Sequence, residues 1–196
     1  MKKTIFYLPD GFADWEGAFL MAELAENKRP FTTVSETGGV VASIGRLKVQ
    51  PDASLADIPP ESIGTLVLIG SDGWVDPSKN KKVLALAGDV LKRGDLLAGI
   101  CASTIALARE GLLDGRKHTS NDLGALKRLV PTYRGEANYQ QSLALRDGNL
   151  ITAPGVGALE FTLELLRALD VYNEEKRDQW YALFKKGTPP PPEFWA

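Results

Sequence analysis

Residues 96–112 read LLAGICASTIALAREGL, and this stretch decides the fold. Its first five residues form a short apolar run typical of a strand buried on both faces, whereas residues 102–110 are rich in helix formers. Cys101, the only cysteine of the chain, therefore stands on a sharp turn from strand to helix. Such a turn lifts a side chain out of the sheet, and the amides at the start of a helix favour negative charge. We predict a reactive thiolate at Cys101, with a pKa below that of free cysteine.

Cys101 also has a purely structural interpretation, because free cysteine is among the most buried residue types and packs as a small hydrophobe. The next three residues are Ala102, Ser103 and Thr104, which are small or polar and leave room above the turn. A core position would more often be followed by further apolar residues. The local sequence therefore favours a nucleophile over a packing residue.

The length and the charge of the chain limit its class of function. A chain of 196 residues suits one domain with a sizeable core. It has 23 basic and 25 acidic residues, and this net charge of −2 argues against a nucleic-acid partner or an anionic membrane surface. We expect small molecules or proteins as partners, with a small-molecule substrate first.

Cysteine and histidine counts point to a protein without disulfides or metal. One cysteine cannot form an internal disulfide, and one cysteine with one histidine gives too few ligands for a structural zinc site. The N-terminal apolar stretch is too short for a signal peptide, and no run reaches the roughly 18 to 20 apolar residues of a membrane helix. We expect a cytoplasmic protein with no metal, no cofactor and no membrane contact.

Strand and helix patterns alternate along the chain, which predicts an α/β fold with a mostly parallel sheet. In the first helix, apolar residues recur at helical spacing and are expected to pack on the sheet: Trp15, Ala18, Phe19, Ala22 and Ala25. We predict strands at residues 4–8, 31–35, 65–69 and 96–100, hairpins at 40–50 and 143–153, and helices at 15–26, 79–93, 102–110, 122–129, 157–169 and 173–187.

Local signals define the ends of several of these elements. Ser120 or Asn121 is a plausible cap for the helix at 122–129, with residues 115–121 before it forming a short strand or a loop. Asn173 is the expected cap of the last helix. Residues 188–196 hold four consecutive prolines and are expected to form neither helix nor strand. Phe194 and Trp195 in this tail either pack on a neighbouring surface or belong to a loosely ordered end.

Several short motifs resemble those of the ThiJ/PfpI superfamily, within the class I glutamine amidotransferase-like fold. They are DGFADWE at 10–16, LIGS at 68–71, AGICA at 98–102, GLLDGRK at 111–117 with Thr119-Ser120, and TAPG at 152–155. Each motif is weak alone, whereas their order and spacing together are specific. The resemblance implies a three-layer flavodoxin-like sandwich with a mostly parallel sheet and a cysteine nucleophile elbow. It also implies one domain over residues 1–187, followed by the Pro-rich tail at 188–196.

The resemblance carries roles onto several residues. Glu16 matches the acidic residue that approaches the cysteine in this family, where a protonated carboxyl stabilises the thiolate; the alternative is a solvated glutamate on a helix surface. The backbone amides of Gly70, Ser71 and Ala102 match those that form an oxyanion hole. Cys101 and Glu16 are therefore the expected catalytic pair.

Three further residues are candidates for the pocket: Asn121, His118 and Trp74. Relatives with hydrolase, glyoxalase or peptidase activity often carry a histidine where this chain has Asn121, and an asparagine cannot act as a general base. His118, the only histidine, lies three residues earlier and should face the opposite side of an extended segment. Trp74 suits either a pocket wall or core packing.

These features favour a Cys101 nucleophile acting on a small electrophile such as a reactive carbonyl compound, as in glyoxalases or hydrolases. The main alternative is an oxidative-stress sensor or protective protein without turnover, in which Cys101 is oxidised. A catalytically silent scaffold is a third option. An intracellular cysteine peptidase or a glutamine amidotransferase fits less well, because no histidine takes the matching position. A symmetric homodimer is the expected assembly.

Overall fold

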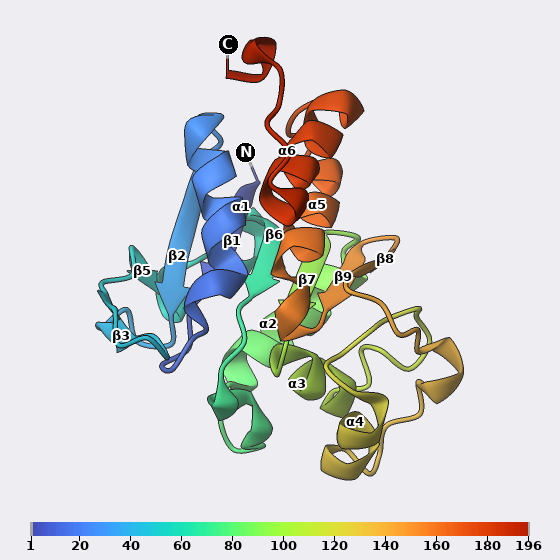
Figure 1. The fold of residues 1–196 in the computed structure, drawn as a ribbon. Coiled ribbons are helices and arrows are strands. Elements are labelled where there is room, and N and C mark those ends of the chain that lie inside the picture. Colours follow the sequence, from blue (N-terminus) through green and yellow to red (C-terminus); the bar gives the residue numbers. More distant parts are fainter. Residues whose placement is uncertain (1, 196) are drawn as a thin grey trace.

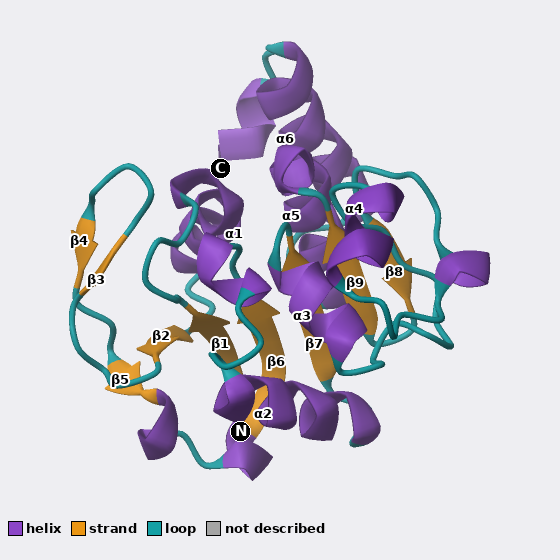
Figure 2. Ribbon diagram, turned by 90° about the horizontal axis from the view of Figure 1, so that it is seen from below, coloured by secondary structure: helices purple, strands orange, loops and turns teal. Residues whose placement is uncertain are grey.

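The computed structural model describes residues 2–195, and its centre is a seven-stranded sheet in the order β5-β2-β1-β6-β7-β9-β8. All neighbouring strands are parallel except β8 and β9, so the predicted mostly parallel sheet is confirmed. Figure 2 shows the strands side by side. Their bounds are β1 Lys3–Tyr7, β2 Phe31–Ser35, β5 Ala53–Ser54, β6 Ile63–Leu68, β7 Leu96–Ile100, β8 Leu145–Asp147 and β9 Leu150–Ala153.

Helices cover both faces of the sheet and complete the predicted three-layer sandwich (Figure 1). One face carries α1 (Asp14–Glu26), α5 (Ala158–Ala168) and α6 (Glu174–Lys186). The other carries α2 (Lys81–Lys92), α3 (Ser103–Arg109) and α4 (Leu123–Leu129). Alternate residues of β6 enter the two cores, because successive side chains of a strand point to opposite faces. Leu66 and Leu68 enter the α2–α3 core, while Val67 enters the core under α1 and α5.

Helix α1 is rotated relative to the sequence prediction. Its fully buried positions are Glu16, Gly17, Leu20 and Leu24. The alanines predicted to pack on the sheet are exposed, and Trp15 is 48% exposed. The prediction was wrong because α1 is apolar on more than one side, so the spacing of its alanines was as regular as that of its leucines. Burying the two leucines removes more apolar surface from water, and the same rotation turns Glu16 inward.

The shorter elements mostly follow the sequence. The predicted hairpin at 40–50 is present as β3 (Val41–Ala42) and β4 (Lys48–Val49), and the hairpin at 143–153 is β8–β9. Strand β5 was not predicted, and within 115–121 only His118 forms an isolated bridge, to Tyr139. Asp122, rather than Ser120 or Asn121, caps α4 by accepting the Ala125 amide at 2.6 Å. Residues 2–195 also contain six 3-10 turns, at 55–57, 60–62, 72–75, 136–138, 155–157 and 192–195.

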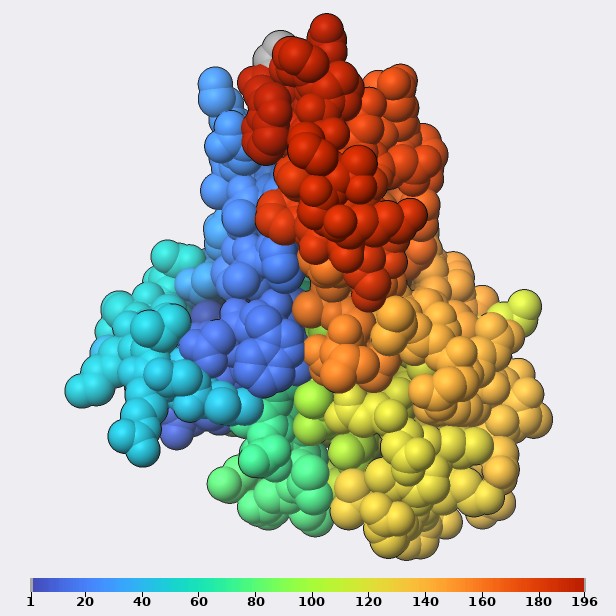
Figure 3. Space-filling view, in the orientation of Figure 1, coloured from blue at the N-terminus to red at the C-terminus, as the bar shows by residue number. Residues whose placement is uncertain are grey.

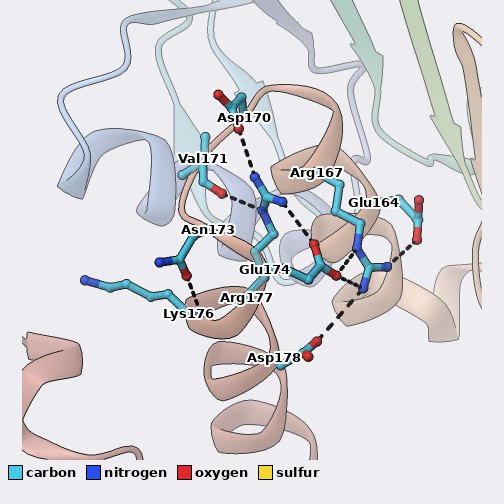
Figure 4. Close-up of polar contacts among 9 residues, drawn as sticks. All are labelled: Glu164, Arg167, Asp170, Val171, Asn173, Glu174, Lys176, Arg177 and Asp178. Atoms are coloured by element: carbon cyan, nitrogen blue, oxygen red, sulfur yellow. Dashed lines mark hydrogen bonds and ion pairs between the residues drawn. The ribbon is translucent and has the colours of Figure 1, made fainter.

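A network of ion pairs joins α5 to α6 (Figure 4). The guanidinium of Arg167 contacts Glu164 and Glu174, and that of Arg177 contacts Glu174 and Asp170. Helix α6 begins at the predicted cap, because the Asn173 side chain accepts the Lys176 amide at 2.8 Å. None of the helices within residues 2–195 is long and apolar enough to cross a membrane.

The C-terminal tail packs on the protein. Phe194 is only 9% exposed, and the Lys176 ammonium lies 5.2 Å from the centre of its ring. In Figure 3 the red C-terminal part of the chain, which includes both α6 and the tail, lies beside α1, in blue. The prediction of no helix in the tail is corrected by the 3-10 turn Pro192–Trp195, because a proline suits the first position of a helical turn. Met1 and Ala196, the outer ends of the predicted domain and tail, lie outside the described residues.

Candidate active site

Cys101 occupies a strained turn directly after β7. Its φ is +60°, a left-handed conformation that costs free energy for a residue with a side chain. The Cys101 amide donates to the Ala153 carbonyl at 2.9 Å, which fixes the turn against the end of β9. Helix α3 begins two residues later, at Ser103. The strand-to-helix elbow is therefore present where the sequence predicts it.

Glu16 reaches this turn from α1 and is fully buried. Its Oε2 accepts the Gly70 amide at 2.6 Å, while its Oε1 has no hydrogen-bond partner within residues 2–195. A Cβ placed on Gly155 would lie 3.0 Å from Glu16 Oε1 and 3.0 Å from Cys101 Sγ. The free carboxyl oxygen and the sulfur thus border the same small space, and the structure brings the predicted pair together.

Burial shifts the pKa of both members of this pair. Burial raises the pKa of Glu16 to about 7, although the Gly70 amide and the Cys101 side chain partly oppose the rise. Burial also raises the pKa of the Cys101 thiol, and the charge of the Glu16 carboxylate adds to that rise. The amides of Asn121 and Ala102 act in the opposite direction. The lowered thiol pKa predicted from the elbow is therefore corrected, because burial and a neighbouring carboxylate outweigh the helix amides.

Asn121 enters the site and bridges two of its walls. Its Nδ2 donates to Cys101 Sγ at 3.3 Å, and its Oδ1 accepts the Gly155 amide at 2.8 Å. The second bond fixes the amide so that its N–H side faces the sulfur. Because Asp122 caps α4, the Asn121 side chain is available for this role.

The three backbone amides predicted for the oxyanion hole have different surroundings. Gly70 donates its amide to Glu16, so this N–H is already used inside the site. Ser71 lines a separate cavity of about 830 Å³, and its hydroxyl donates to the Asp10 carbonyl at 2.7 Å. The Ala102 amide remains beside the thiol, where it lowers the Cys101 pKa. Ala102 and Asn121 are therefore the predicted residues whose N–H groups lie beside the sulfur.

His118 and Trp74 lie outside the site. The His118 ring is fully buried, with Nδ1 bonded to the Arg116 carbonyl at 2.7 Å and Nε2 to the Tyr133 hydroxyl at 2.6 Å. Burial lowers the pKa of this imidazole. Trp74 donates its indole N–H to the Ile69 carbonyl at 2.8 Å and has a packing role in the core. Neither of them lines the pocket of Cys101.

A pocket of about 590 Å³ opens above Cys101 and is largely apolar. Beside Cys101, Asn121 and Gly155, it is lined by Trp15, Phe19, Val156, Ala158 and Leu159. These five walls were not predicted as site residues. Trp15 lies next to Glu16 in the DGFADWE motif, but its apolar character alone suggested packing on the sheet. Only the rotation of α1 shows that it faces the pocket.

A flavodoxin-like sandwich with a cysteine elbow and a neighbouring buried glutamate defines the class of protein. The chain belongs to the DJ-1/PfpI family, which it matches over residues 2–168. This finding confirms the ThiJ/PfpI resemblance of the sequence.

Individual relatives match this chain to different extents. The uncharacterized protease YoaZ from Bacillus subtilis is 35% identical over 196 residues, which span 96% of this chain and 93% of the relative. The crystal structure of a ThiJ/PfpI family protein from Bacillus anthracis superposes with a TM-score of 0.92 at 36% identity and covers 99% of this chain and 93% of its own. Deglycase PfpI from Pyrococcus furiosus is 27% identical over 118 residues, 60% of this chain and 71% of that protein.

Proposed function

We propose that this protein is a cysteine-dependent enzyme whose Cys101 thiolate adds to the carbonyl carbon of a small reactive aldehyde or 1,2-dicarbonyl compound. Glu16 moves the proton. The observation that carries the proposal is the buried Glu16 Oε1, which has no partner within residues 2–195 and borders the same space as the sulfur. Addition to an aldehyde requires a nucleophile and a proton donor, and it has no leaving amine. This pair supplies both groups.

The pair releases its protons in two steps. Because the pKa of Glu16 is about 7 and that of the thiol is raised, the first proton leaves near neutral pH. The remaining proton resides either on the sulfur or on Oε1, and only the second arrangement leaves a thiolate. The Asn121 amide stabilises this arrangement through its 3.3 Å contact with Sγ. The reactive form is a minor population that becomes available as the pH rises through about 7.

With a 1,2-dicarbonyl substrate, the reaction balances with water alone. Sγ bonds to the aldehyde carbon, the carbonyl electron pair moves to oxygen, and that oxygen takes the proton from Glu16. Glu16 then removes the hydrogen of the same carbon as a proton, and the electron pair of that C–H bond forms a C=C bond while the adjacent carbonyl becomes an enediolate oxygen. Glu16 returns the proton to the adjacent carbon, and the hydroxyl proton of the first carbon passes to the oxygen of the adjacent carbon. The hemithioacetal thereby becomes a thioester of a 2-hydroxy acid. Water hydrolyses the thioester, releases the acid and restores the thiol.

The names of the relatives support an enzyme, since they include both deglycases and proteases. Peptide hydrolysis has less support from the site, because a cysteine peptidase pairs its nucleophile with a histidine that takes the thiol proton and returns it to the leaving amine. His118 is bonded to Arg116 and Tyr133 in the interior and does not line the pocket.

Methylglyoxal provides the direct test. We expect the wild-type protein to convert it to lactate catalytically, and the Cys101→Ser variant to form none above background. The Glu16→Gln variant keeps the shape of the side chain but cannot move a proton, so it should lose about 10²-fold or more in turnover. Thermal melting of each variant controls for folding. Equal lactate formation by wild type and Cys101→Ser would remove the cysteine from the reaction.

The same pair also suits a redox-responsive protein without turnover, because a thiolate at an open pocket oxidises readily. Mild peroxide should add oxygen atoms to Cys101, as measured by intact mass. Oxidation of Cys101 together with no turnover on a panel of aldehydes and dicarbonyls would favour this second function over the enzyme.

A further inference from the structure

The wall of the pocket above Cys101 is apolar over most of its area. Trp15, Phe19, Val156 and Leu159 supply most of the side chains, and no Lys, Arg, Asp or Glu of the described chain lines it. Trp15 is 48% exposed and Val156 is 82% exposed, so large apolar groups face solvent around a reactive sulfur. A ligand that covers them gains the free energy of removing this surface from water.

Trp15 is a fixed wall. Its indole N–H donates to the Gly155 carbonyl at 2.9 Å, and the Gly155 amide donates to Asn121 Oδ1 at 2.8 Å. The ring is thereby tied, through Gly155 and Asn121, to the group that contacts the sulfur. In Figure 3 the surface of α1, in blue, adjoins the segment that leads into α5, in orange.

The charge around the sulfur disfavours anions. The ionisable groups of the site are Glu16 and Cys101 itself, and both become negative when they lose a proton. With no cation in the pocket wall, a carboxylate or phosphate on the ligand would lose water without gaining an opposite charge.

We infer that this pocket takes carbonyl compounds in which the carbonyl carries a neutral aryl or branched alkyl group, and that Trp15 determines this preference by packing against that group. As a statement about turnover, the inference rests on the proposed function. As a statement about which electrophiles reach Sγ, it can be measured on its own.

Alkylation tests the preference without any turnover. Three probes share the same leaving group: iodoacetamide, N-phenyl iodoacetamide and its 4-carboxyphenyl derivative. In each case the sulfur bonds to the CH₂ carbon and iodide leaves. After division by the rate with a free thiol, we expect the phenyl probe to alkylate Cys101 about tenfold faster than iodoacetamide, and the carboxyphenyl probe to lose that advantage.

Variants of two exposed tryptophans test whether Trp15 causes the preference for the phenyl probe. Trp15→Ala should remove most of the roughly tenfold preference, whereas Trp15→Phe, which keeps an aromatic ring but not the bond to Gly155, should keep part of it. The matched control is Trp195→Ala, because Trp195 is 69% exposed and lies in the tail, away from the pocket. An unchanged preference in Trp15→Ala, or the absence of any preference in wild type, would overturn the inference.

Turnover gives the second measurement. Phenylglyoxal should have a higher kcat/KM than 4-carboxyphenylglyoxal, and Trp15→Ala should narrow the difference. If no dicarbonyl is consumed but the phenyl probe is preferred, the proposed function fails and the ligand preference stands. If both glyoxals are consumed equally well, the function stands and the preference is refuted.

Discussion

At the scale of single residues, the proposed chemistry depends on where one proton resides. Glu16 and Cys101 are both buried enough to resist ionisation, and they border the same space beside Gly155. Neither residue alone would be a nucleophile near neutral pH. Together they lose one proton near the Glu16 pKa of about 7. When the remaining proton resides on Glu16, the sulfur is a thiolate.

The pH dependence of Cys101 alkylation should reveal this pair. In wild type, we expect the iodoacetamide rate to rise in a first step at about pH 7 and to rise again at the higher pKa of the thiol. In Glu16→Gln the first step should be absent, because no second acid shares the proton. A wild-type profile with one step at the ordinary cysteine pKa of about 8.5 would contradict the paired titration.

The same carboxyl should make stability depend on pH. The folded-state pKa of Glu16 is raised from 4.5 to about 7, so its contribution is fully present below pH 4.5 and is lost as the pH rises through about 7. The free energy of unfolding should fall by about 3 kcal/mol at most over this pH range. Urea unfolding of wild type and Glu16→Gln at several pH values measures it. The variant should gain stability relative to wild type between pH 5 and 8, and a constant difference would refute the raised pKa.

At the scale of the elements, the site is made by four segments that meet at the edge of the sheet where β6, β7 and β9 end. Helix α1 supplies Glu16, the end of β6 supplies Gly70, the end of β7 supplies Cys101 and the segment after β9 supplies Gly155. Gly70 and Gly155 are required for close approach: a Cβ on Gly70 would lie 2.6 Å from Glu16 Oε2 and 2.7 Å from Cys101 Cβ.

Gly155→Ala should therefore disable the site. The added methyl must displace the sulfur or the carboxyl, and we expect turnover to fall by about 10²-fold, with a stability cost of about 1–3 kcal/mol. Gly115→Ala is the matched control, since nothing lies within 4 Å of a Cβ at that glycine. Turnover assays and thermal melting of both variants provide the comparison. Full activity in Gly155→Ala would show that the pair is less tightly enclosed.

The sequence was a good guide to the elements and a partial guide to the site. Strand β7, the elbow and the Asn173 cap could be predicted because each depends on residues close together in the chain. The rotation of α1 could not, because two sets of apolar residues on this helix had the same spacing. For the same reason Trp15 was missed. The use of the Gly70 amide by Glu16 depends on a contact between residues 54 positions apart, which no local pattern encodes.

His118 shows how a loop can depend on a residue that resembles a catalytic one. Its ring joins Arg116 to Tyr133, and its backbone bridges to Tyr139. We expect His118→Ala to lower the free energy of unfolding by about 2 kcal/mol, because it removes a buried ring and leaves two partly buried partners unpaired. Turnover should change far less than the roughly 10²-fold that follows the loss of a general base. A drop of that size in a folded variant would return His118 to the mechanism.

At the scale of the whole molecule, the C-terminal tail packs on the face of the sandwich that carries α1, α5 and α6. The tail returns to this face and packs Phe194 beside Lys176 of α6 and near the end of α1. The pocket of Cys101 is on the same face but has different lining residues. Stability and catalysis should therefore respond separately to changes in the tail.

Two neighbouring aromatic residues allow this separation to be tested in the full-length chain. Phe194 is 9% exposed and Trp195 is 69% exposed, although they are adjacent in sequence. Phe194→Ala should lower the free energy of unfolding by about 2 kcal/mol, because a ring that is nearly buried becomes a methyl group. Trp195→Ala should change it by less than about 0.5 kcal/mol. In both variants the Cys101 alkylation rate should equal that of wild type. Urea unfolding and the alkylation rate are measured on the same preparations, and slower alkylation in Phe194→Ala alone would show that the tail also supports the site.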